Sequence, residues 1–509
     1  MSAEVSRAVA ETLPRGPRYG DVIEVTITRL GHAGHGEVVW DVVVGPQEMP
    51  RSYVVQVRKA MVGDRVRAVI EGRKRLTLSA RLDAVLEPAP GRTEPRCSHY
   101  GQRETAGQGC GGCTIQALTY PAQLTAKHAR IERAFAAHGM AEATIAPILP
   151  MAADGDGEWR YRNKMEFSFG DDRDRVLAVG LYPTGWRNEI VPLTECHLIS
   201  AAGAGLVPLV RDWVEAQGIP AYSPRGNTGF LRQLTVREGK HTAERLVELV
   251  TTPVTEVMTA AGEVSAESIA VQFAAFIQDA AKSLGSQVTS VYWTQHVAIR
   301  GHATTMSSQV MAGAEMLHET LTLPGGRVLR FGIHPRAFFQ PNPKQAQVLC
   351  AEAIARLGEA RTVLDLYCGT GTLGMCVAPF VDRVIGVEIV AEAVANAQQN
   401  AALNALDNVE YIVGDVGAVL ADPALDLGGV VDAVIVDPPR AGLSPKAIAQ
   451  VVELAPPRLV YVSCNPVTLA RDLRVFCDAG YVIEGVVQPV DLFPQTQHVE
   501  NVVALTWPT

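Results

Sequence analysis

Short apolar runs alternate with helix-like segments from residue 362 to residue 479, and this alternation constrains the fold more than any other feature. Strands that alternate with helices pair in parallel, because each helix carries the chain back across the sheet. The sequence therefore predicts a doubly wound, Rossmann-like α/β sheet in a C-terminal domain over residues 331–509. In such sheets, ligands bind outside the carboxyl ends of the strands. The expected strands are Thr362–Leu366, Arg383–Val387, Val409–Val413, Val431–Val436 and Leu459–Val462.

A cysteine lies at the end of the last of these strands. The apolar run that begins at Arg458 stops at Asn465-Pro466, which places Cys464 at the edge of the ligand crevice. An isolated cysteine is more often a small buried hydrophobe, but a strand end before a proline-broken loop favours a nucleophile. The preceding strand ends in Asp437-Pro438-Pro439-Arg440. These neighbouring groups predict covalent chemistry on a flat, electron-poor ring.

A glycine-rich loop follows the first strand and opens a helix. Gly369, Gly371 and Gly374 match the pattern G-x-G-x-x-G, which fits a dinucleotide as well as a methyl-donor cofactor. Glu388, at the end of the next strand, is expected to bind a ribose diol, and Asp415 to meet an adenine edge. An NAD-dependent dehydrogenase has no evident use for the thiol or for the acidic loop before Arg440, so a methyl donor is favoured.

Residues 15–85 contain five short alternating runs separated by Gly, Asp and Pro, which predict a small β-barrel of the oligonucleotide-binding kind. The whole chain has a formal net charge of −9. Between Arg51 and Arg81, however, nine basic residues stand against only Asp64 and Glu71. A localised excess of one sign is typical of a phosphate-binding surface, although most charge runs are only solvated faces.

Residues 95–330 mix helix-like and hairpin-like runs and predict an α+β central domain. Its segment Tyr161–Phe167 alternates aromatic and basic residues, a pattern as consistent with RNA contact as with an amphipathic strand. No stretch has the length and purity of a membrane helix, and no apolar segment follows the start. We therefore expect a cytoplasmic protein.

Nine cysteines in such a protein argue for metal binding rather than for disulfides. Three of them are close in the sequence and one is distant, a spacing that suits tetrahedral zinc or a four-iron, four-sulfur cluster and does not choose between them. These candidate ligands are Cys97, Cys110, Cys113 and Cys196. Four others are expected to be structural thiols: Cys350, Cys368, Cys376 and Cys477.

Five ordered motifs resemble those of the RNA uracil-5-methyltransferase family. The motifs are Phe339-Gln-Pro-Asn342, Asp365-Leu-Tyr-Cys-Gly-Thr-Gly371, Asp437-Pro-Pro-Arg440, Ser463-Cys-Asn-Pro466 and Asp491-Leu-Phe-Pro with His498-Val-Glu500. An N-terminal barrel of the TRAM type and a cysteine cluster are similar to the 23S ribosomal RNA branch of the family. One departure is the twelve residues between Cys97 and Cys110, where the family has a much shorter gap.

The resemblance implies specific partners and roles. It implies RNA as the substrate, with ribosomal RNA favoured over transfer RNA, and a protein that acts as a monomer. It makes S-adenosylmethionine the methyl donor, contacted by Gln340, Tyr367, Glu388 and Asp437 beside Gly369 of the glycine loop. The resemblance also favours a 4Fe–4S cluster over zinc as the group that the four cysteines bind.

The chemistry of uracil agrees with these roles. Carbon 5 is a poor nucleophile until a thiolate, here Cys464, adds to carbon 6 and turns the ring into an enolate. A carboxylate must then remove the proton from carbon 5, and the resemblance places this base at Glu500. We expect Arg440 or neighbouring polar groups to stabilise the enolate oxygen.

Two other functions compete with this interpretation. An exocyclic-amine methyltransferase would share the sheet, but it needs no cysteine and usually has Tyr or Phe where this chain has Arg440. A non-catalytic RNA-binding iron–sulfur protein would show a damaged glycine loop or a missing nucleophile. Gly369 and Cys464 are both present, which disfavours this alternative.

Overall fold

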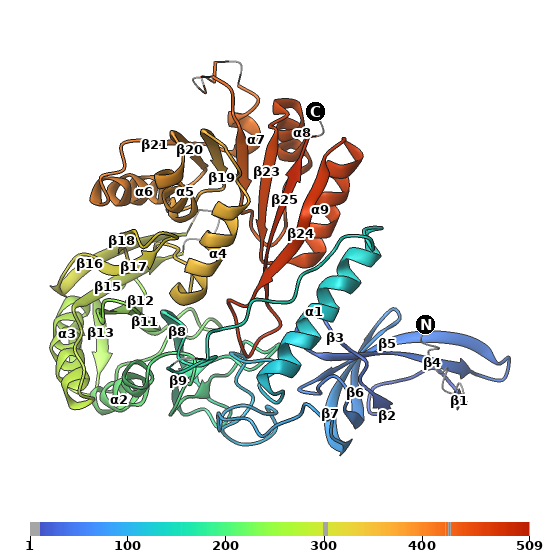
Figure 1. The fold of residues 1–509 in the computed structure, drawn as a ribbon. Coiled ribbons are helices and arrows are strands. Elements are labelled where there is room, and N and C mark those ends of the chain that lie inside the picture. The colour runs from blue at the N-terminus through green and yellow to red at the C-terminus, as the bar shows by residue number, and fades with distance from the viewer. Residues whose placement is uncertain are drawn as a thin grey trace.

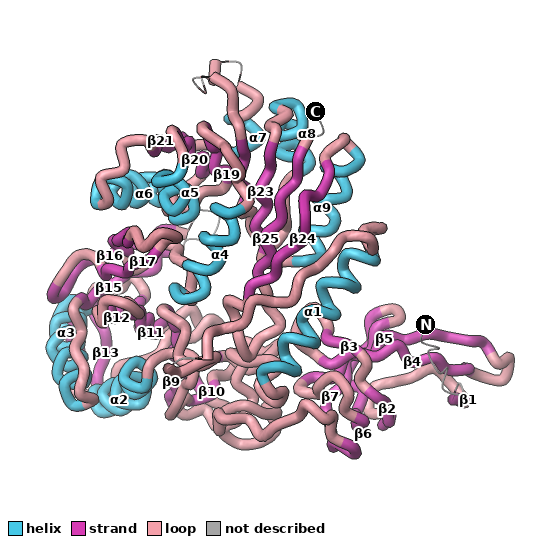
Figure 2. The backbone as a smooth tube through the Cα atoms, viewed as in Figure 1, coloured by secondary structure: helices cyan, strands magenta, loops and turns pink. Residues whose placement is uncertain are grey.

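The computed structural model describes residues 11–507 apart from positions 154, 299–303, 423, 426 and 428. Three sheet-centred lobes surround a junction that consists mainly of loops (Figures 1 and 2). Within the described ranges, no helix is both long and apolar enough to cross a bilayer.

The N-terminal lobe is a curled seven-stranded sheet, in the order β1-β4-β5-β7-β6-β2, with β3 paired to β4. Side chains alternate between its two faces, as in β2, and the inward set forms a core that includes Val55, Val57 and Ile70. The strands are β1 (Glu11–Leu13), β2 (Val22–Thr26), β3 (Arg29–Leu30), β4 (Gly36–Val44), β5 (Met49–Arg58), β6 (Arg65–Lys74) and β7 (Thr77–Glu87).

The central lobe is a second seven-stranded sheet, in the order β10-β9-β8-β11-β12-β15-β16. Helices α2 and α3 pack against each other and cover one side of this sheet (Figure 1). The elements are β8 (Lys164–Asp171), β9 (Leu177–Leu181), β10 (Val191–Pro192), α2 (Ala201–Gln217), β11 (Leu231–Glu238), β12 (Arg245–Thr251), α3 (Ala266–Ser283), β15 (Ser290–Val297) and β16 (Thr305–Gly313).

Two hairpins accompany the central lobe. One is formed by β13 (Glu256–Thr259) and β14 (Gly262–Ser265), beside α3. The other, β17 (Leu317–Thr322) with β18 (Val328–Ile333), contacts helices of the C-terminal lobe and links the two cores.

The C-terminal lobe confirms the predicted doubly wound α/β sheet. Its strand order is β21-β20-β19-β22-β23-β25-β24, with five parallel strands and an antiparallel pair at one end. The strands are β19 (Thr362–Leu366), β20 (Arg383–Glu388), β21 (Val409–Val413), β22 (Ala433–Val436), β23 (Arg458–Ser463), β24 (Val482–Val490) and β25 (Glu500–Thr506). The helices are α4 (Pro343–Ala355), α5 (Thr372–Val377), α6 (Ala391–Leu403), α7 (Val416–Val419), α8 (Pro445–Leu454) and α9 (Pro466–Asp478), with a 3₁₀ turn at Ala378–Phe380.

Helix α1 (Tyr120–Ala137) connects the lobes. It packs against α9 of the C-terminal lobe and against β3 of the N-terminal lobe (Figure 1). The segment after it adds to the free edge of the C-terminal sheet, because Ile145 bridges to Val487 and Leu149 to Val490 in parallel.

Candidate active site

Strand register brings the predicted nucleophile and the predicted base together. β23 and β25 are antiparallel, with Ser463 opposite Asn501. Cys464 and Glu500 are the next residues beyond this pair, so they lie across from each other where the ladder ends. Both line a pocket of about 590 Å³, and Asp437 lines it from the neighbouring β22. Cys464 and Asp437, which the sequence places at neighbouring strand ends, therefore line one crevice, and Glu500 lines it as well.

The acidic groups of this pocket hold their protons strongly in the protein alone. Burial, followed by the charges of Glu500 and Asp437, raises the pKa of Cys464 to about 12, and Arg440 opposes this shift. Burial raises the pKa of Asp437 to about 7. Burial and then Asp437 also raise the pKa of Glu500 well above its usual value. The thiol thus needs a further positive charge or a proton acceptor before it can react.

Arg440 and His498 form a polar contact at the mouth of the pocket. The guanidinium donates to His498 Nε2 at 3.3 Å, and burial followed by the charge of Arg440 lowers the histidine pKa to about 3. The imidazole is therefore neutral. The loop of Arg440 is fixed to the loop after Cys464, because Asn465 Nδ2 donates to the Arg440 carbonyl at 3.0 Å.

The glycine loop forms the other end of the pocket. Gly369 and Gly371 adopt φ values of 56° and 73°, which favour glycine, and Tyr367 also lies in this region at 63°. Asp365 accepts from the Gly374 amide at 2.9 Å through one oxygen, while its other oxygen, Oδ1, is buried without a partner. Burial and then Asp437 raise the Asp365 pKa to about 7. An unsatisfied carboxyl oxygen here suits a ligand that carries a positive charge.

The residues predicted to bind the cofactor divide into two groups. Gln340, Tyr367, Gly369 and Asp437 line the pocket. Glu388 and Asp415 are not among its described lining residues. Glu388 accepts from the amides of Gly369 at 3.1 Å and Val390 at 2.9 Å, so it braces the glycine loop. Asp415 caps α7 by accepting from the Ala418 amide at 3.0 Å.

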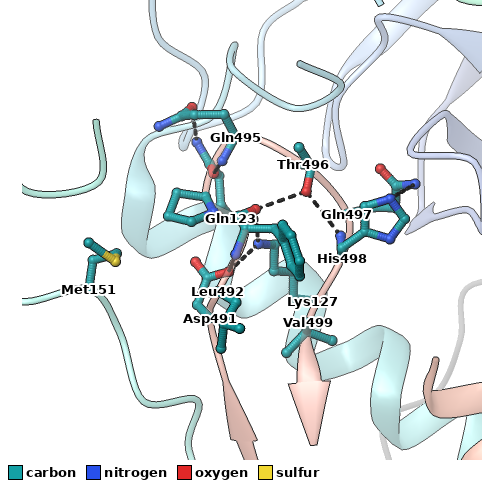
Figure 3. A network of polar contacts seen from close by, with 12 residues as sticks. Gln123, Lys127, Met151, Asp491, Leu492, Gln495, Thr496, Gln497, His498 and Val499 are labelled. Carbon is teal, nitrogen blue, oxygen red and sulfur yellow. Dashed lines mark hydrogen bonds and ion pairs between the residues drawn. The ribbon is translucent and has the colours of Figure 1, made fainter. Parts of the chain in front are cut away.

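The loop from Asp491 to Val499, hereafter the catalytic loop, leads directly into Glu500. Helix α1 holds it with Lys127, whose Nζ donates to Asp491 Oδ1 at 2.6 Å and to the Phe493 carbonyl at 3.0 Å (Figure 3). Gln123 and Gln495 exchange two hydrogen bonds of 2.9 Å. Sequence reasoning missed both α1 residues, since their partners are more than 360 positions away.

The four candidate metal ligands converge on the loop-rich junction. The charges of Cys97 and Cys196 act on both Cys110 and Cys113, and burial is the main reason that all four thiol pKa values are raised. Among the described residues, however, no three ligands are arranged to hold a metal ion. The site also touches the catalytic loop, because the amides of Thr114 and Ile115 donate to the Gln495 carbonyl at 3.0 and 3.1 Å.

The long gap before Cys110 folds back on the central lobe. Arg103 pairs with Glu189, with 3.1 Å from one guanidinium nitrogen to the carboxylate. His99 accepts from the Thr194 amide at 3.0 Å, and its other ring nitrogen donates to the Gly107 carbonyl at 2.8 Å. The insertion therefore forms a bracing loop between the cysteine-bearing segment and the central lobe.

Two further residues line the pocket: Phe338, which was not identified from the sequence, and Arg162, from the segment Tyr161–Phe167. Phe338 is 64% exposed, directly before the Phe339-Gln340 motif that could have identified it. Arg162 lines the same pocket, and its Nε is buried without a hydrogen-bond partner. Its segment is tied to the catalytic loop, since Tyr161 Oη donates to the Pro494 carbonyl at 3.0 Å.

The basic stretch of the N-terminal lobe is more neutral than its sequence suggests. Cross-strand partners compensate Arg65, which contacts Glu24 at 3.0 Å and Glu87 at 2.7 Å, and similar pairs involve Arg58, Arg67 and Arg81. Lys59 is buried, and its Nζ donates to the Cys113 carbonyl at 2.8 Å. The exposed cations for which the structure shows no ion pair within the described chain are Arg51, Arg73, Lys74 and Arg75.

The chain resembles known proteins over most of its length. A family model described as tRNA (Uracil-5-)-methyltransferase matches residues 258–416 and 423–507. An uncharacterised RNA methyltransferase of Protochlamydia amoebophila is 36% identical over 89% of this chain and 100% of its own length. Another from Caldanaerobacter subterraneus is 31% identical, with 95% and 98% covered. The crystal structure of Pyrococcus abyssi tRNA (uracil-54, C5)-methyltransferase with S-adenosyl-L-homocysteine shares the fold, with a TM-score of 0.68, 24% identity, and 95% and 100% covered.

Proposed function

Since the chain belongs to the RNA uracil-5-methyltransferase family, we propose that it methylates carbon 5 of a uridine in ribosomal RNA with S-adenosylmethionine as the methyl donor. The observation that carries the proposal is the register of β23 and β25, which sets Cys464 opposite Glu500 in a pocket that Asp437 also lines. A thiol and a carboxyl on facing strand ends are the two groups that this reaction needs.

The reaction uses these groups in turn. The Cys464 thiol first loses its proton to solvent. Its thiolate Sγ then bonds to carbon 6 of uracil, and the electron pair of the double bond moves to the carbonyl oxygen at carbon 4. Carbon 5 then attacks the methyl carbon of the sulfonium, whose carbon–sulfur bond breaks to release S-adenosylhomocysteine. Glu500 acts in its ionised form and removes the proton from carbon 5, the double bond re-forms, and the bond from Sγ to carbon 6 breaks. Arg440 is placed at the pocket mouth to stabilise the oxyanion.

From the raised pKa values we infer that the Cys464 thiol is mostly protonated until the substrates bind. Removing a proton from Cys464 adds negative charge beside Asp437 and Glu500, which is unfavourable in the protein alone. The sulfonium of the donor brings a positive charge to the same pocket and lowers the pKa of Cys464. Formation of the nucleophile is thereby coupled to the presence of the donor.

The donor site combines the glycine loop with the carboxyl groups around it. We assign Gln340, Tyr367, Gly369 and Asp437 as direct contacts, because they line the pocket. The unpartnered Oδ1 of Asp365 supports a cationic ligand at this end. Glu388 and Asp415 follow the next two strands, and we propose that they bind the ribose and the adenine once the donor is present.

The target uridine must leave its stack to reach Cys464. Phe338 offers a largely exposed aromatic face at the pocket entrance, suited to stacking on an extruded base. Arg162 has an unpartnered Nε at the same place and can donate to a uracil oxygen.

For the four thiols we propose a 4Fe–4S cluster with a structural role. Four thiolates on one zinc ion lie within about 4 Å of each other, given a Zn–S distance of about 2.3 Å. In a four-iron cluster each thiolate binds a different iron, so the thiolates are further apart. The support from the structure is that the charges of Cys97 and Cys196 act on both Cys110 and Cys113, and the choice of iron over zinc rests on the resemblance to the family. The cluster would fix the loop that contacts Gln495.

The remaining parts of the proposal concern the whole molecule. Residues 15–85 act as a TRAM-like RNA-binding lobe, residues 95–330 as the cluster-bearing lobe and residues 331–509 as the catalytic lobe. We expect a monomer that works in the cytoplasm.

A deletion strain tests the proposal. Mass-spectrometric mapping should show one or more 5-methyluridines missing from ribosomal RNA, and the purified protein should restore them in vitro with S-adenosylmethionine. Loss from transfer RNA instead would correct the substrate and leave the reaction standing. Loss of an N-methylated base instead would support the exocyclic-amine alternative and overturn the mechanism.

A further inference from the structure

A groove of about 1200 Å³ leads from the surface into the catalytic pocket. Arg162, Phe338, Pro341 and His498 line both, so the groove and the pocket are continuous. The groove runs past Gly111 and Gly112 of the cysteine loop and along residues 181–188 of the central lobe. Nucleotides adjacent to the target uridine therefore have to lie in this groove.

The walls of the groove carry cations that the protein itself does not neutralise. Two other cations on these walls do have partners within the protein. Lys164 is paired with Glu166 at 2.7 Å, and Arg237 donates to the carbonyls of His334 at 2.7 Å and Ala337 at 2.8 Å. Arg187 and Arg336 also line the groove, and within the described chain the structure shows no ion pair for either. Two uncompensated guanidinium groups favour a polyanion such as an RNA backbone.

An exposed tryptophan stands on the same wall. Trp186 is 40% exposed at the end of a tight turn, in which its amide donates to the Pro183 carbonyl at 3.1 Å and Gly185 has φ of 81°. The guanidinium of Arg103 lies over the indole, 3.8 Å from the ring centroid. Glu189 holds that guanidinium in place. Arg103 belongs to the insertion between Cys97 and Cys110, so the insertion reinforces this wall.

We propose that Trp186 stacks on a base next to the target uridine, with Arg103 supporting the opposite face of the indole. Arg187, the next residue, neutralises the phosphate of that nucleotide. This inference rests on the proposed function and adds a second base-binding subsite, distinct from the target pocket. A stack of guanidinium, indole and base is stabilised by cation–π attraction and by base stacking, and it tolerates any base because each has a π face.

The proposal gives the insertion between Cys97 and Cys110 a function in RNA binding. Backbone contacts already join the turn from Pro183 to Trp186 to the cysteine-bearing segment, because the Thr184 amide donates to the Gly109 carbonyl at 3.3 Å and Cys110 bridges to Pro183. Arg103 adds a contact of this segment that lies on the indole itself. The bracing loop thus couples the cysteine site to RNA binding through the groove wall, independently of the contacts between the cysteine loop and the catalytic loop.

The test compares Trp186→Ala, Trp186→Phe and Arg103→Ala with the wild type. We expect Trp186→Ala to raise KM for in vitro transcribed 23S ribosomal RNA about tenfold, since stacking on an aromatic side chain typically contributes that much. The value of kcat and the affinity for S-adenosylmethionine should not change, and Trp186→Phe should restore most of the loss. Arg103→Ala should give a smaller increase in KM. Tyr222→Ala is the matched control, because Tyr222 forms a similar pair with Arg232 at 4.1 Å outside the groove.

Abasic scanning identifies the stacked nucleotide. A short RNA around the methylated uridine is made with one neighbouring base removed at a time, and the affinity for each RNA is measured by fluorescence anisotropy. One abasic position should weaken the wild type about tenfold and leave Trp186→Ala unaffected. Equal losses in both proteins at every position would refute the subsite. If the wild type methylates no uridine, the proposed function fails, whereas an unchanged KM for Trp186→Ala in an active enzyme rejects only the stacking.

Quenching of tryptophan fluorescence tests the stacking without the alanine variant, so the result does not depend on how well that variant folds. Binding of the same short RNA should quench the tryptophan fluorescence of the wild type more than that of Trp186→Phe, because this variant lacks the indole that stacks on the base. The same quenching in both proteins would contradict the proposal.

Discussion

Lys127 Nζ and Asp491 Oδ1 are 2.6 Å apart, and neither side chain is accessible to solvent. One residue belongs to α1, before the central lobe, and the other opens the catalytic loop that ends at Glu500. Burial is the main reason that the pKa of Lys127 is lowered, and the charge of Asp491 opposes it. The ion pair therefore fixes the loop against α1, and we propose that Lys127 is a positioning residue for Glu500.

Lys127→Met should destabilise the protein by about 3–5 kcal/mol, because it leaves the Asp491 carboxylate buried without a positive charge beside it. Urea denaturation followed by intrinsic fluorescence measures the change. The double variant Lys127→Met/Asp491→Leu should recover much of the loss, since it removes both charges. The matched control is Lys282→Met at an exposed helix position, which should have little effect. A Lys127→Met protein as stable as the wild type would show that the pair does not hold the loop.

Cys464→Ala should abolish turnover and the covalent trapping of RNA that contains 5-fluorouridine. The fluorine at carbon 5 cannot be removed as a proton, so the wild-type enzyme stays attached to the ring. A gel shift that resists denaturation measures the trapping, and calorimetry should show that S-adenosylmethionine still binds. Trapping by the alanine variant would exclude Cys464 as the nucleophile.

Glu500→Gln should separate the two halves of the reaction. The variant should add to uracil and transfer the methyl group, but it should release product at least a hundredfold more slowly, as expected for loss of a general base. A protein–RNA adduct that contains the labelled methyl group should accumulate. Turnover at the wild-type rate would place the base elsewhere.

The reactivity of Cys464 should depend on pH and on the charge of the bound donor. With a pKa of about 12 in the protein alone, the thiolate fraction should rise tenfold for each pH unit between 7 and 10 without levelling off. Alkylation of the Cys464 peptide, followed by mass spectrometry, measures this rise. S-adenosylmethionine should accelerate alkylation relative to S-adenosylhomocysteine, because the two differ by the positive charge and are similar in size. Equal rates would show that the sulfonium does not activate the thiol.

Glu500→Gln also tests the cause of the raised pKa of Cys464. The Glu500 charge is the largest cause, after burial, of the raised Cys464 pKa. Its removal should lower that pKa and speed alkylation in the absence of donor, and a slower reaction would contradict the assignment.

Protein purified without oxygen should be brown and contain close to four iron and four sulfide per chain if the four thiols hold the proposed cluster. Cys113→Ser should lose the colour and bind RNA more weakly, yet bind S-adenosylmethionine normally. One zinc per chain without acid-labile sulfide would reject the cluster and leave the methyltransferase assignment intact. Cys477→Ser, which changes a thiol outside the group, should remain brown.

The sequence predicted the strand ends well because parallel strands obey a general rule. Cys464 and Asp437 each follow an apolar run, and the carboxyl ends of such runs meet at one edge. Glu500 could be assigned only through its motif. Its place opposite Cys464 depends on the antiparallel pairing of β25 with β23, which no local pattern indicates.

In helix α1, the spacing of apolar residues predicts the buried face but not the burial of Lys127. Leu124, Ile131 and Phe135 are spaced to share one apolar face of a helix, and a lysine at position 127 is usually exposed. Lys127 is instead fully buried, because its partner is supplied by the catalytic loop 364 positions later. In the same way, the charge of the N-terminal lobe could not be judged from composition, since residues such as Glu24 and Glu87 neutralise Arg65 only after the strands pair.

The bridges from Ile145 and Leu149 to β24 have a consequence for how the protein is made. These early residues, together with α1, dock on strands and loops that leave the ribosome last. Until synthesis nears its end, the face of α1 that carries Ile131 and Phe135 lacks its partners in the C-terminal lobe, whereas the N-terminal sheet closes on its own residues. Long-range pairings of this kind form slowly and leave apolar surface exposed in the meantime. Nascent chains of this protein should therefore engage chaperones mainly through the segment around α1, and ribosome profiling of chaperone-bound chains would locate that engagement.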